Sequence, residues 1–404
     1  MNAAHPYERE YRPQVPPART PEPDVSDSAT ALEWLDSELP NLLAAATYAS
    51  EHDRPTHLLH LSTILQRHLR TRARNQDAIA LAQKALATAR ATGHQAAETD
   101  ALIGLGHVHR MEGGLEEASD HYQQVLRLAR ATGNRAAELV ALVGLGIVHR
   151  LQCRYEQATD HYQQALRLAQ ATGNRLTELQ ALIGLGIVHR SHGRYEQAID
   201  HYQQALQLAQ ATGYQGVEGD ALVGLGVVHR LQGRYELATD HYQQALQLAQ
   251  ATGNRAAELR PLAGLGHVHR VSGRYEQAAV HYQRLLELSN RNVNRNYQFE
   301  AWQGLGRLRH ATGHPDDAVA HHDRALALAT GMDQPDDQSR AHDGLARAYH
   351  ALHRPEQART HWQHALDILT RLGIDRTDDE TTVSSICAHL ADLKLQTAQP
   401  SMGY

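Results

Sequence analysis

Five histidine–arginine pairs recur at intervals of 40 residues and are the first candidates for chemistry in this sequence. GLGIVHR occurs at 144–150 and 184–190, and near-copies begin at residues 104, 224 and 264. Imidazole can act as an acid, a base or a metal ligand, and guanidinium binds carboxylates and phosphates. However, helices pack roughly 10 Å apart, whereas a zinc ion lies about 2 Å from each ligand nitrogen. The spacing therefore predicts neither a metal site nor a cofactor in the histidine series.

The histidines are better explained as packing residues. The first series is predicted to be half-buried and hydrogen-bonded to a neighbour such as Asp160 or a tyrosine, with a metal site or proton relay as the alternative. It comprises His109, His149, His189, His229 and His269. A second series adjoins tyrosines in DHYQQAL-like segments and is predicted to lie on the outer face. It comprises His121, His161, His201, His241 and His281.

No set of residues in the sequence predicts catalysis. The two cysteines, Cys153 and Cys387, form no metal or redox motif. A dinucleotide-binding G-x-G-x-x-G would need a third glycine where His149 stands, and a preceding strand. Glycine within a helix costs about 0.5–1 kcal/mol relative to alanine, so Gly144 and Gly146 instead predict closely approaching helices. We expect no catalytic residues, with a small-molecule sensor or an unusual biosynthetic enzyme as the alternative.

Composition narrows the class of partner. The 404 residues carry a formal net charge of −6, which argues against nucleic-acid binding. No stretch approaches the ~20 apolar residues of a membrane span, and the N-terminus lacks the apolar run of a signal peptide. The expected location is the cytoplasm.

The chain divides into 40-residue units that must position these residues. The units run from residue 61 to 380, and those starting at 101, 141, 181, 221 and 261 are nearly identical. We predict a Pro-rich disordered or extended tail at 1–28, capping helices at 29–60, eight repeats at 61–380, and a capping helix with a tail at 381–404. In the 141–180 unit, helices are predicted at about 136–152 and 155–171, with Gly173 as a C-cap and Asn174 as the next N-cap. Pro40 and Pro261 are expected to kink, split or delay their helices.

These units resemble the tetratricopeptide repeat (TPR). The family pattern W-x2-L-G-x2-Y…A-x3-F is matched by Leu142-x2-Leu145-Gly146-x2-His149…Ala158-x3-Tyr162, with Leu replacing Trp and His replacing Tyr. The resemblance implies an all-α fold: a right-handed α-solenoid of about eight helix hairpins with capping helices at both ends. A narrower resemblance, carried by YRPQ and ALEWLDSELPNLLAAATYA, is to the TPR arm of SARP/AfsR-type regulators. With neither a P-loop nor a helix-turn-helix candidate, the chain is expected to act as a detached effector or sensor arm.

The resemblance also implies a binding surface, because the first helix of each TPR unit lines a concave groove. Groove positions are expected to form a Val/Ile floor flanked by an arginine ladder, unless each arginine pairs with an acidic neighbour such as Glu156. Two breaks in the repetition, at 214–220 and 290–310, add aromatic and arginine residues. The predicted partner-binding residues are Arg110, Val143, Ile147, Arg150, Ile183, Ile187, Arg190, Val223, Val227, Arg230, His267, Arg270, Tyr297, Trp302 and Arg307. The expected function is regulatory binding of a partner protein or peptide, with oligomerisation through the array ends as an open alternative.

Overall fold

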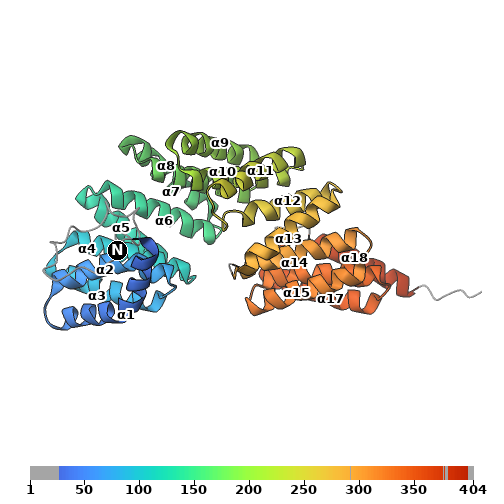
Figure 1. Ribbon diagram of the computed structural model, residues 1–404, viewed down its shortest axis with the longest axis horizontal. Helices are drawn as coiled ribbons and strands as arrows, with labels where there is room; N and C mark the ends of the chain where they lie inside the picture. The colour runs from blue at the N-terminus through green and yellow to red at the C-terminus, as the bar shows by residue number, and fades with distance from the viewer. Residues whose placement is uncertain (1–26, 292, 376, 378–380, 399–404) are drawn as a thin grey trace, which may run out of the picture. The chain divides into compact units, whose positions relative to one another are not determined.

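The computed structural model describes residues 27–291, 293–375, 377 and 381–398 (Figure 1). The predicted tail at 1–28 lies outside this part except for its last two residues. The described residues form eighteen helices: α1 Ser28–Glu51, α2 Pro55–Thr71, α3 Asn75–Thr92, α4 Gln95–Met111, α5 Leu115–Thr132, α6 Arg135–Leu151, α7 Tyr155–Thr172, α8 Arg175–Ser191, α9 Tyr195–Thr212, α10 Gln215–Leu231, α11 Tyr235–Ala251, α12 Leu259–Val271, α13 Tyr275–Arg291, α14 Arg295–Ala311, α15 Pro315–Gly331, α16 Pro335–Ala351, α17 Pro355–Leu372 and α18 Val383–Ala398.

Successive helices pack as antiparallel hairpins, which confirms the predicted all-α, TPR-like fold class. The chain divides into two compact units, which we call the N-terminal unit (residues 1–194) and the C-terminal unit (residues 195–404). In each repeat we call the helix that carries the Gly-x-Gly segment the first helix and the next one the second helix. Thus α4, α6 and α8 are first helices of the N-terminal unit, and α10, α12, α14 and α16 occupy the same place in the C-terminal unit.

Local sequence signals set the helix boundaries. Asn174 begins α8 because its side chain accepts a hydrogen bond from the backbone N–H of Thr177. Gly173, at φ +71°, ends α7 in the left-handed conformation that glycine adopts most easily. Cys153 has the same conformation at φ +57° and separates α6 from α7. The boundaries predicted for this repeat are therefore confirmed to within one residue.

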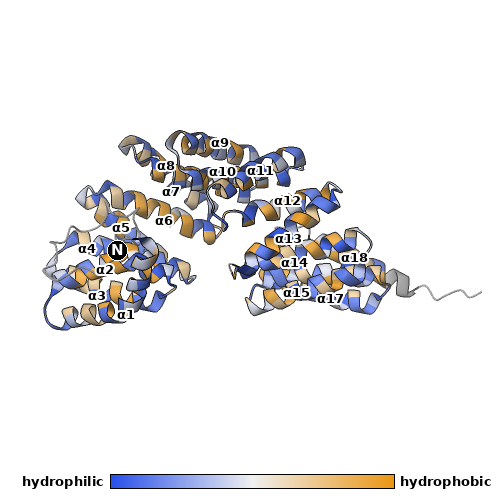
Figure 2. Cartoon of the chain, viewed as in Figure 1, coloured by the Kyte–Doolittle hydropathy of each residue, from blue (hydrophilic) through white to orange (hydrophobic). Residues whose placement is uncertain are grey.

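The core explains why each first helix carries two glycines. A Cβ on Gly144 would lie 2.7 Å from the Tyr122 ring of the preceding repeat, and a Cβ on Gly146 would lie 2.7 Å from the Tyr162 ring of its own repeat. Both tyrosines are almost fully buried, with exposed fractions of 0% and 2%. Figure 2 shows hydrophobic and hydrophilic residues mixed along each helix, as expected of helices that bury one face. The close approach predicted from the glycines is confirmed, and a tyrosine ring fills each contact.

Three features near the ends and the middle of the chain depart from the regular repeat. Pro261 delays its helix as predicted: α12 has 13 residues, whereas α10 has 17. Pro40 does not split α1, which continues through it. At the other end, Ile386 and Leu393 of α18 pack against Trp362 of α17, and Cys387 is exposed.

Candidate functional site

The first helices of the N-terminal unit share one partly exposed stripe, which we call the first-helix face. It consists of Val143, Ile147 and Arg150 in α6 and of Ile183, Ile187 and Arg190 in α8. All six side chains are half-buried, and the positions between them on the same helices are mostly buried. Val143 and Ile147 lie against the cluster formed by Tyr162 and its neighbours, so their outer atoms form a shallow apolar surface.

Two arginines of the repeated series, Arg110 and Arg150, interact with buried tyrosines. No ion pair among the described residues includes Arg110, Arg150, Arg190 or Arg230, so the alternative of an acidic partner for each arginine is not supported for these four. Burial raises the pKa of Tyr122, and its interaction with the Arg110 guanidinium opposes that rise. Arg150 acts on Tyr162 in the same way. The hydroxyls of Tyr122 and Tyr162 thus lie beside the guanidinium groups of Arg110 and Arg150. Because a tyrosine hydroxyl is neutral, it does not compensate the charge of the arginine.

The apolar side chains of the first-helix face do not continue into α4, the preceding first helix, where polar residues take their place. His107 takes the place of Ile147 in α4 and forms a hydrogen bond with Arg70 of α2. Burial, together with the charges of Arg70 and Arg110, lowers the pKa of His107 to about 3. At neutral pH this ring is therefore uncharged, and the positive charge here belongs to the two arginines.

In the C-terminal unit, one of the side chains at the repeat positions of the first-helix face is less exposed. Val223 is only 5% exposed because it packs into a cluster with Leu222 and Ala245, so its predicted role in partner binding is not supported. Val227, Arg230, His267 and Arg270 remain half-buried. A cavity of about 260 Å³ lies beside Val223, bounded by Gly219, Arg260 and neighbouring residues. This is below the roughly 300–1,000 Å³ usual for small-molecule sites.

The three binding residues predicted from the break at 290–310 each contact different neighbours. They are Tyr297, Trp302 and Arg307. Tyr297 borders a polar cavity of about 570 Å³ with Glu300 and Arg340. Trp302 stacks on His321 of α15, with the centroids of the two rings 5.3 Å apart. Arg307 lies 3.4 Å from the hydroxyl of Thr381.

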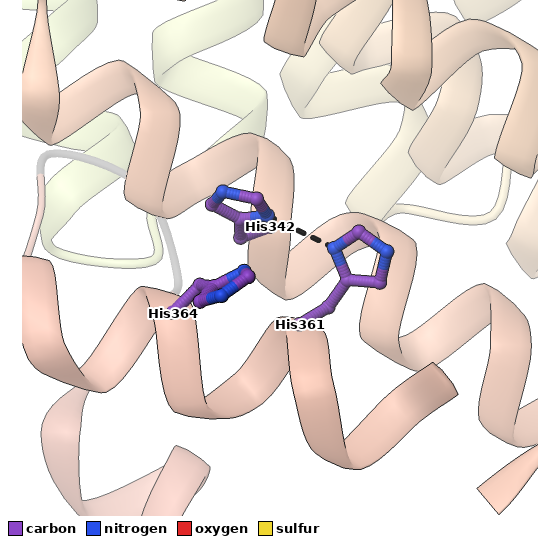
Figure 3. Close-up of side chains that lie close together, drawn as sticks. All are labelled: His342, His361 and His364. Carbon is purple, nitrogen blue, oxygen red and sulfur yellow. Dashed lines mark hydrogen bonds between the residues drawn. The ribbon is translucent and has the colours of Figure 1, made fainter. Parts of the chain in front are cut away.

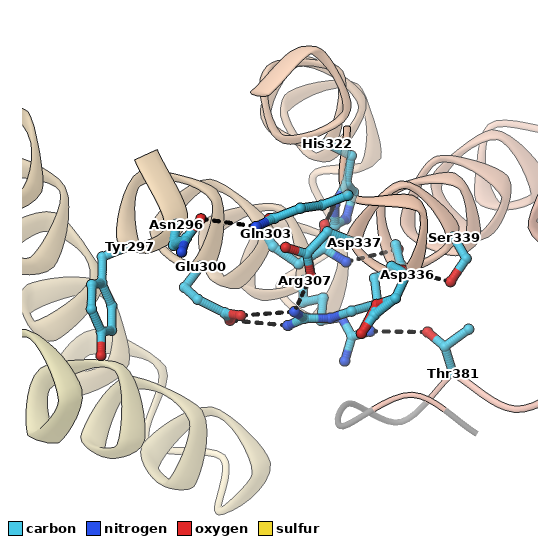
Figure 4. A network of polar contacts seen from close by, with 12 residues as sticks. Asn296, Tyr297, Glu300, Gln303, Arg307, His322, Asp336, Asp337, Ser339 and Thr381 are labelled. Carbon is cyan, nitrogen blue, oxygen red and sulfur yellow. Dashed lines mark hydrogen bonds and ion pairs between the residues drawn. The ribbon is translucent and has the colours of Figure 1, made fainter. Parts of the chain in front are cut away.

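Arg340 pairs with Glu300 and Asp337, two labelled residues of the polar network in Figure 4. It is only 8% exposed at the side chain and forms two hydrogen bonds with the Glu300 carboxylate, at 2.7 and 2.9 Å. A third, at 2.8 Å, goes to Asp337. Burial raises the pKa of Asp337 to about 6, although Arg340 opposes the rise. Two acceptors already satisfy this guanidinium, so the network serves to join α14 to α16.

The repeated histidines form stacked pairs. His149 of α6 stacks on His161 of α7 with ring centroids 5.2 Å apart, and the same positions pair as His109–His121, His229–His241 and His269–His281. The second series, predicted on the outer face, is half-buried, and its rings lie against those of the first series. The hydrogen bond expected from His149 to an aspartate such as Asp160 is not found in the described part of the chain. Burial lowers the pKa of His149 and of His161, so this pair is uncharged at neutral pH.

Two groups of residues were not predicted from the sequence. One is the network of Glu300, Asp337 and Arg340, and the other is a cluster of His342, His361 and His364. For the histidine cluster, the sequence contains a signal: two residues differ from those at the same positions of other repeats. His342 stands where other repeats have Leu142 and Leu182, and His364 stands where they have Gln164 and Gln204.

Hairpins of this length, with a Gly-x-Gly first helix and an aromatic second helix, define a helical-repeat protein. The family model for the tetratricopeptide repeat matches residues 137–211, 218–291, 257–331 and 297–371, which together cover more than half of the chain. The chain therefore belongs to the tetratricopeptide repeat family.

Solved structures show the same fold at low sequence identity. The apo form of the quorum sensor NprR from B. thuringiensis superposes with a TM-score of 0.62 at 14% identity, over 84% of this chain and 99% of that one. The apo form of RapI gives 0.57 at 11% identity, over 68% and 99%. A Rap protein complexed with competence and sporulation factor gives 0.54 at 14% identity, over 86% and 99%. No curated protein sequence matches the chain significantly. Within the described ranges, none of the helices has the length and apolar character needed to cross a bilayer.

Proposed function

We propose that this protein is a regulatory scaffold that binds a peptide segment of a partner on the first-helix face of its N-terminal unit. The observation that carries the proposal is the combination of half-exposed aliphatic side chains with arginines that form no ion pair among the described residues. Four aliphatic side chains offer apolar contacts: Val143, Ile147, Ile183 and Ile187. Arg150 and Arg190 can each donate a bidentate hydrogen bond to a carboxylate. A peptide with aliphatic side chains and carboxylates complements both properties.

The fold comparisons support this kind of ligand. The similar structures include a quorum sensor and a Rap protein complexed with competence and sporulation factor. The resemblance of the N-terminal half to the arms of SARP/AfsR-type regulators is in keeping with a sensor or effector arm. In that role, the bound peptide would bias a second domain or a separate protein.

Selection from a random peptide display library tests the proposal, because it samples many ligand sequences at once and requires no identified partner. Peptides enriched on the wild-type protein should carry Asp, Glu or a free C-terminal carboxylate next to aliphatic residues. We then expect Arg150→Glu/Arg190→Glu to weaken binding of a selected peptide about tenfold or more, because each charge reversal replaces attraction with repulsion. Fluorescence anisotropy measures the change.

The matched control reverses a charge elsewhere in the same repeat. Arg167 is exposed on the second helix α7, so Arg167→Glu should change affinity less than about twofold. Equal losses in the two variants, or no loss in either, would rule out the first-helix face as the binding surface. Far-UV circular dichroism of each variant confirms that the helices remain folded.

A further inference from the structure

We propose that His342, His361 and His364 form a binding site for a divalent transition-metal ion such as Zn²⁺, at the contact between α16 and α17. Figure 3 shows the three imidazoles converging on one another. One ring nitrogen from each residue lies within 4.8 Å of the other two. Across the described residues, no other three His, Cys, Asp or Glu side chains meet in this way.

The helices place the three rings on facing surfaces. His361 and His364 are three residues apart on α17 and therefore lie on the same side of that helix. His342 projects from α16, and its Nδ1 lies 2.9 Å from Nδ1 of His361. Nitrogens bound to one tetrahedral zinc ion lie about 3.3 Å apart, given a Zn–N distance of about 2.0–2.1 Å. A bound ion would therefore require side-chain rotations that bring all three nitrogens to this separation.

The repeat pattern indicates that this cluster is not ordinary packing. His361 occupies the position of the stacked histidines, such as His161, that recur along the chain. At the positions that hold Leu142 and Gln164 in the 141–180 repeat, the last repeat has His342 and His364. The first change replaces a side chain that is 1% exposed in its own repeat with a half-buried polar one. Two independent departures thus converge on the same point in space.

The surroundings favour a bound cation. Burial and the charges of the other two rings together lower the pKa of His342 to about 4. Asp323 interacts electrostatically with His361 and supplies the negative charge that often accompanies metal-bound histidines. Asp367 and Arg371 border an open cavity of about 430 Å³ together with His342 and His364, and the Asp367 carboxylate offsets the arginine charge there. This cavity has room for a water molecule or for Asp367 as a fourth ligand.

A bound ion would link α16 to α17 in the last repeat. Titration calorimetry with ZnCl₂ on the untagged, EDTA-treated full chain tests whether the ion binds. We expect one ion per chain, with a dissociation constant in the micromolar range or below. Co²⁺ should give the intense visible absorption of a tetrahedral complex. His342→Leu and His364→Gln restore the residues of other repeats, so they should fold normally and weaken binding at least 100-fold.

The control variant is His161→Gln, which alters the same repeat position as His361 but has no third histidine beside it. It should bind Zn²⁺ as the wild type does. The proposal is overturned if the wild type binds no stoichiometric ion, if it binds several ions weakly, or if His342→Leu and His364→Gln both leave affinity unchanged. Circular dichroism separates a loss of metal from a loss of fold.

Discussion

Replacing Gly144 with alanine tests the packing that positions the first-helix face. Helix propensity alone favours alanine by about 0.5–1 kcal/mol. The new Cβ, however, would lie 2.7 Å from Cε1 and Cζ of Tyr122, well inside the roughly 3.5–4.0 Å of a normal carbon–carbon contact. Tyr122 is fully buried and also lies against Gly106, so its ring cannot retreat. Overpacking of this kind costs about 1–3 kcal/mol. We therefore expect a net loss of about 1–2 kcal/mol in the free energy of unfolding.

The matched control for this variant is Gly219→Ala. A Cβ at Gly219 in α10 meets only Leu248 Cδ2, at 3.9 Å, which is an ordinary contact. This substitution should stabilise the protein by about 0.5–1 kcal/mol, because only the propensity term remains. The two variants should thus change stability in opposite directions.

Urea titration followed by far-UV circular dichroism measures both variants. Because repeat arrays can unfold in parts, hydrogen exchange should also show increased opening of α5, α6 and α7 in Gly144→Ala. In a Tyr122→Leu background the cost of Gly144→Ala should shrink, since the ring that it meets is gone. A Gly144→Ala protein as stable as the wild type would refute the reasoning that tyrosine rings require these glycines.

Three further predictions follow from named contacts. Asn174→Ala should lower the free energy of unfolding by about 1 kcal/mol in urea titration, because α8 loses its N-cap, and an unchanged midpoint would contradict this. Arg340→Ala should lower the free energy of unfolding by about 2–3 kcal/mol, because it removes a buried partner from two carboxylates. Arg260→Ala should lower it by less than about 1 kcal/mol, because the pair of Arg260 with Asp220 is exposed. Equal losses in the two variants would argue against the network in Figure 4. Burial holds the pKa of His269 at about 4, below its unfolded value of 6.5, so the unfolded state binds protons first as pH falls. Stability should therefore decrease between about pH 7 and 4, and His269→Phe should reduce that slope; a midpoint independent of pH would exclude this linkage.

The sequence predicted those parts of the fold that local chemistry decides. Gly173 and Asn174 mark a boundary on their own, because a left-handed residue and a side-chain acceptor are needed at those two positions in the chain. Gly144 predicted a close approach, although the sequence alone did not identify Tyr122 as the residue it meets. Pro261 predicted the short α12.

Contacts between distant residues were harder to predict. The sequence placed Val143 and Val223 at the same repeat position, but only Val143 stays partly exposed, because Val223 packs into a cluster with its neighbours. The pair of Glu300 and Arg340 joins residues 40 positions apart and matches no known motif. Histidines of the His161 series are half-buried, because an imidazole of the first helix stacks on each ring, and the sequence did not predict this stacking.

The central claim is that the first-helix face of the N-terminal unit is where a partner peptide binds. Site-specific photo-crosslinking tests it most directly, with a benzophenone amino acid placed at Ile147 on that face or at Gln163, which is exposed on the second helix α7. Mass spectrometry then identifies the product formed with a peptide selected from the display library. The account predicts a crosslinked product from position 147 and none from position 163. Crosslinking from position 163 alone, with the peptide still bound, would contradict it.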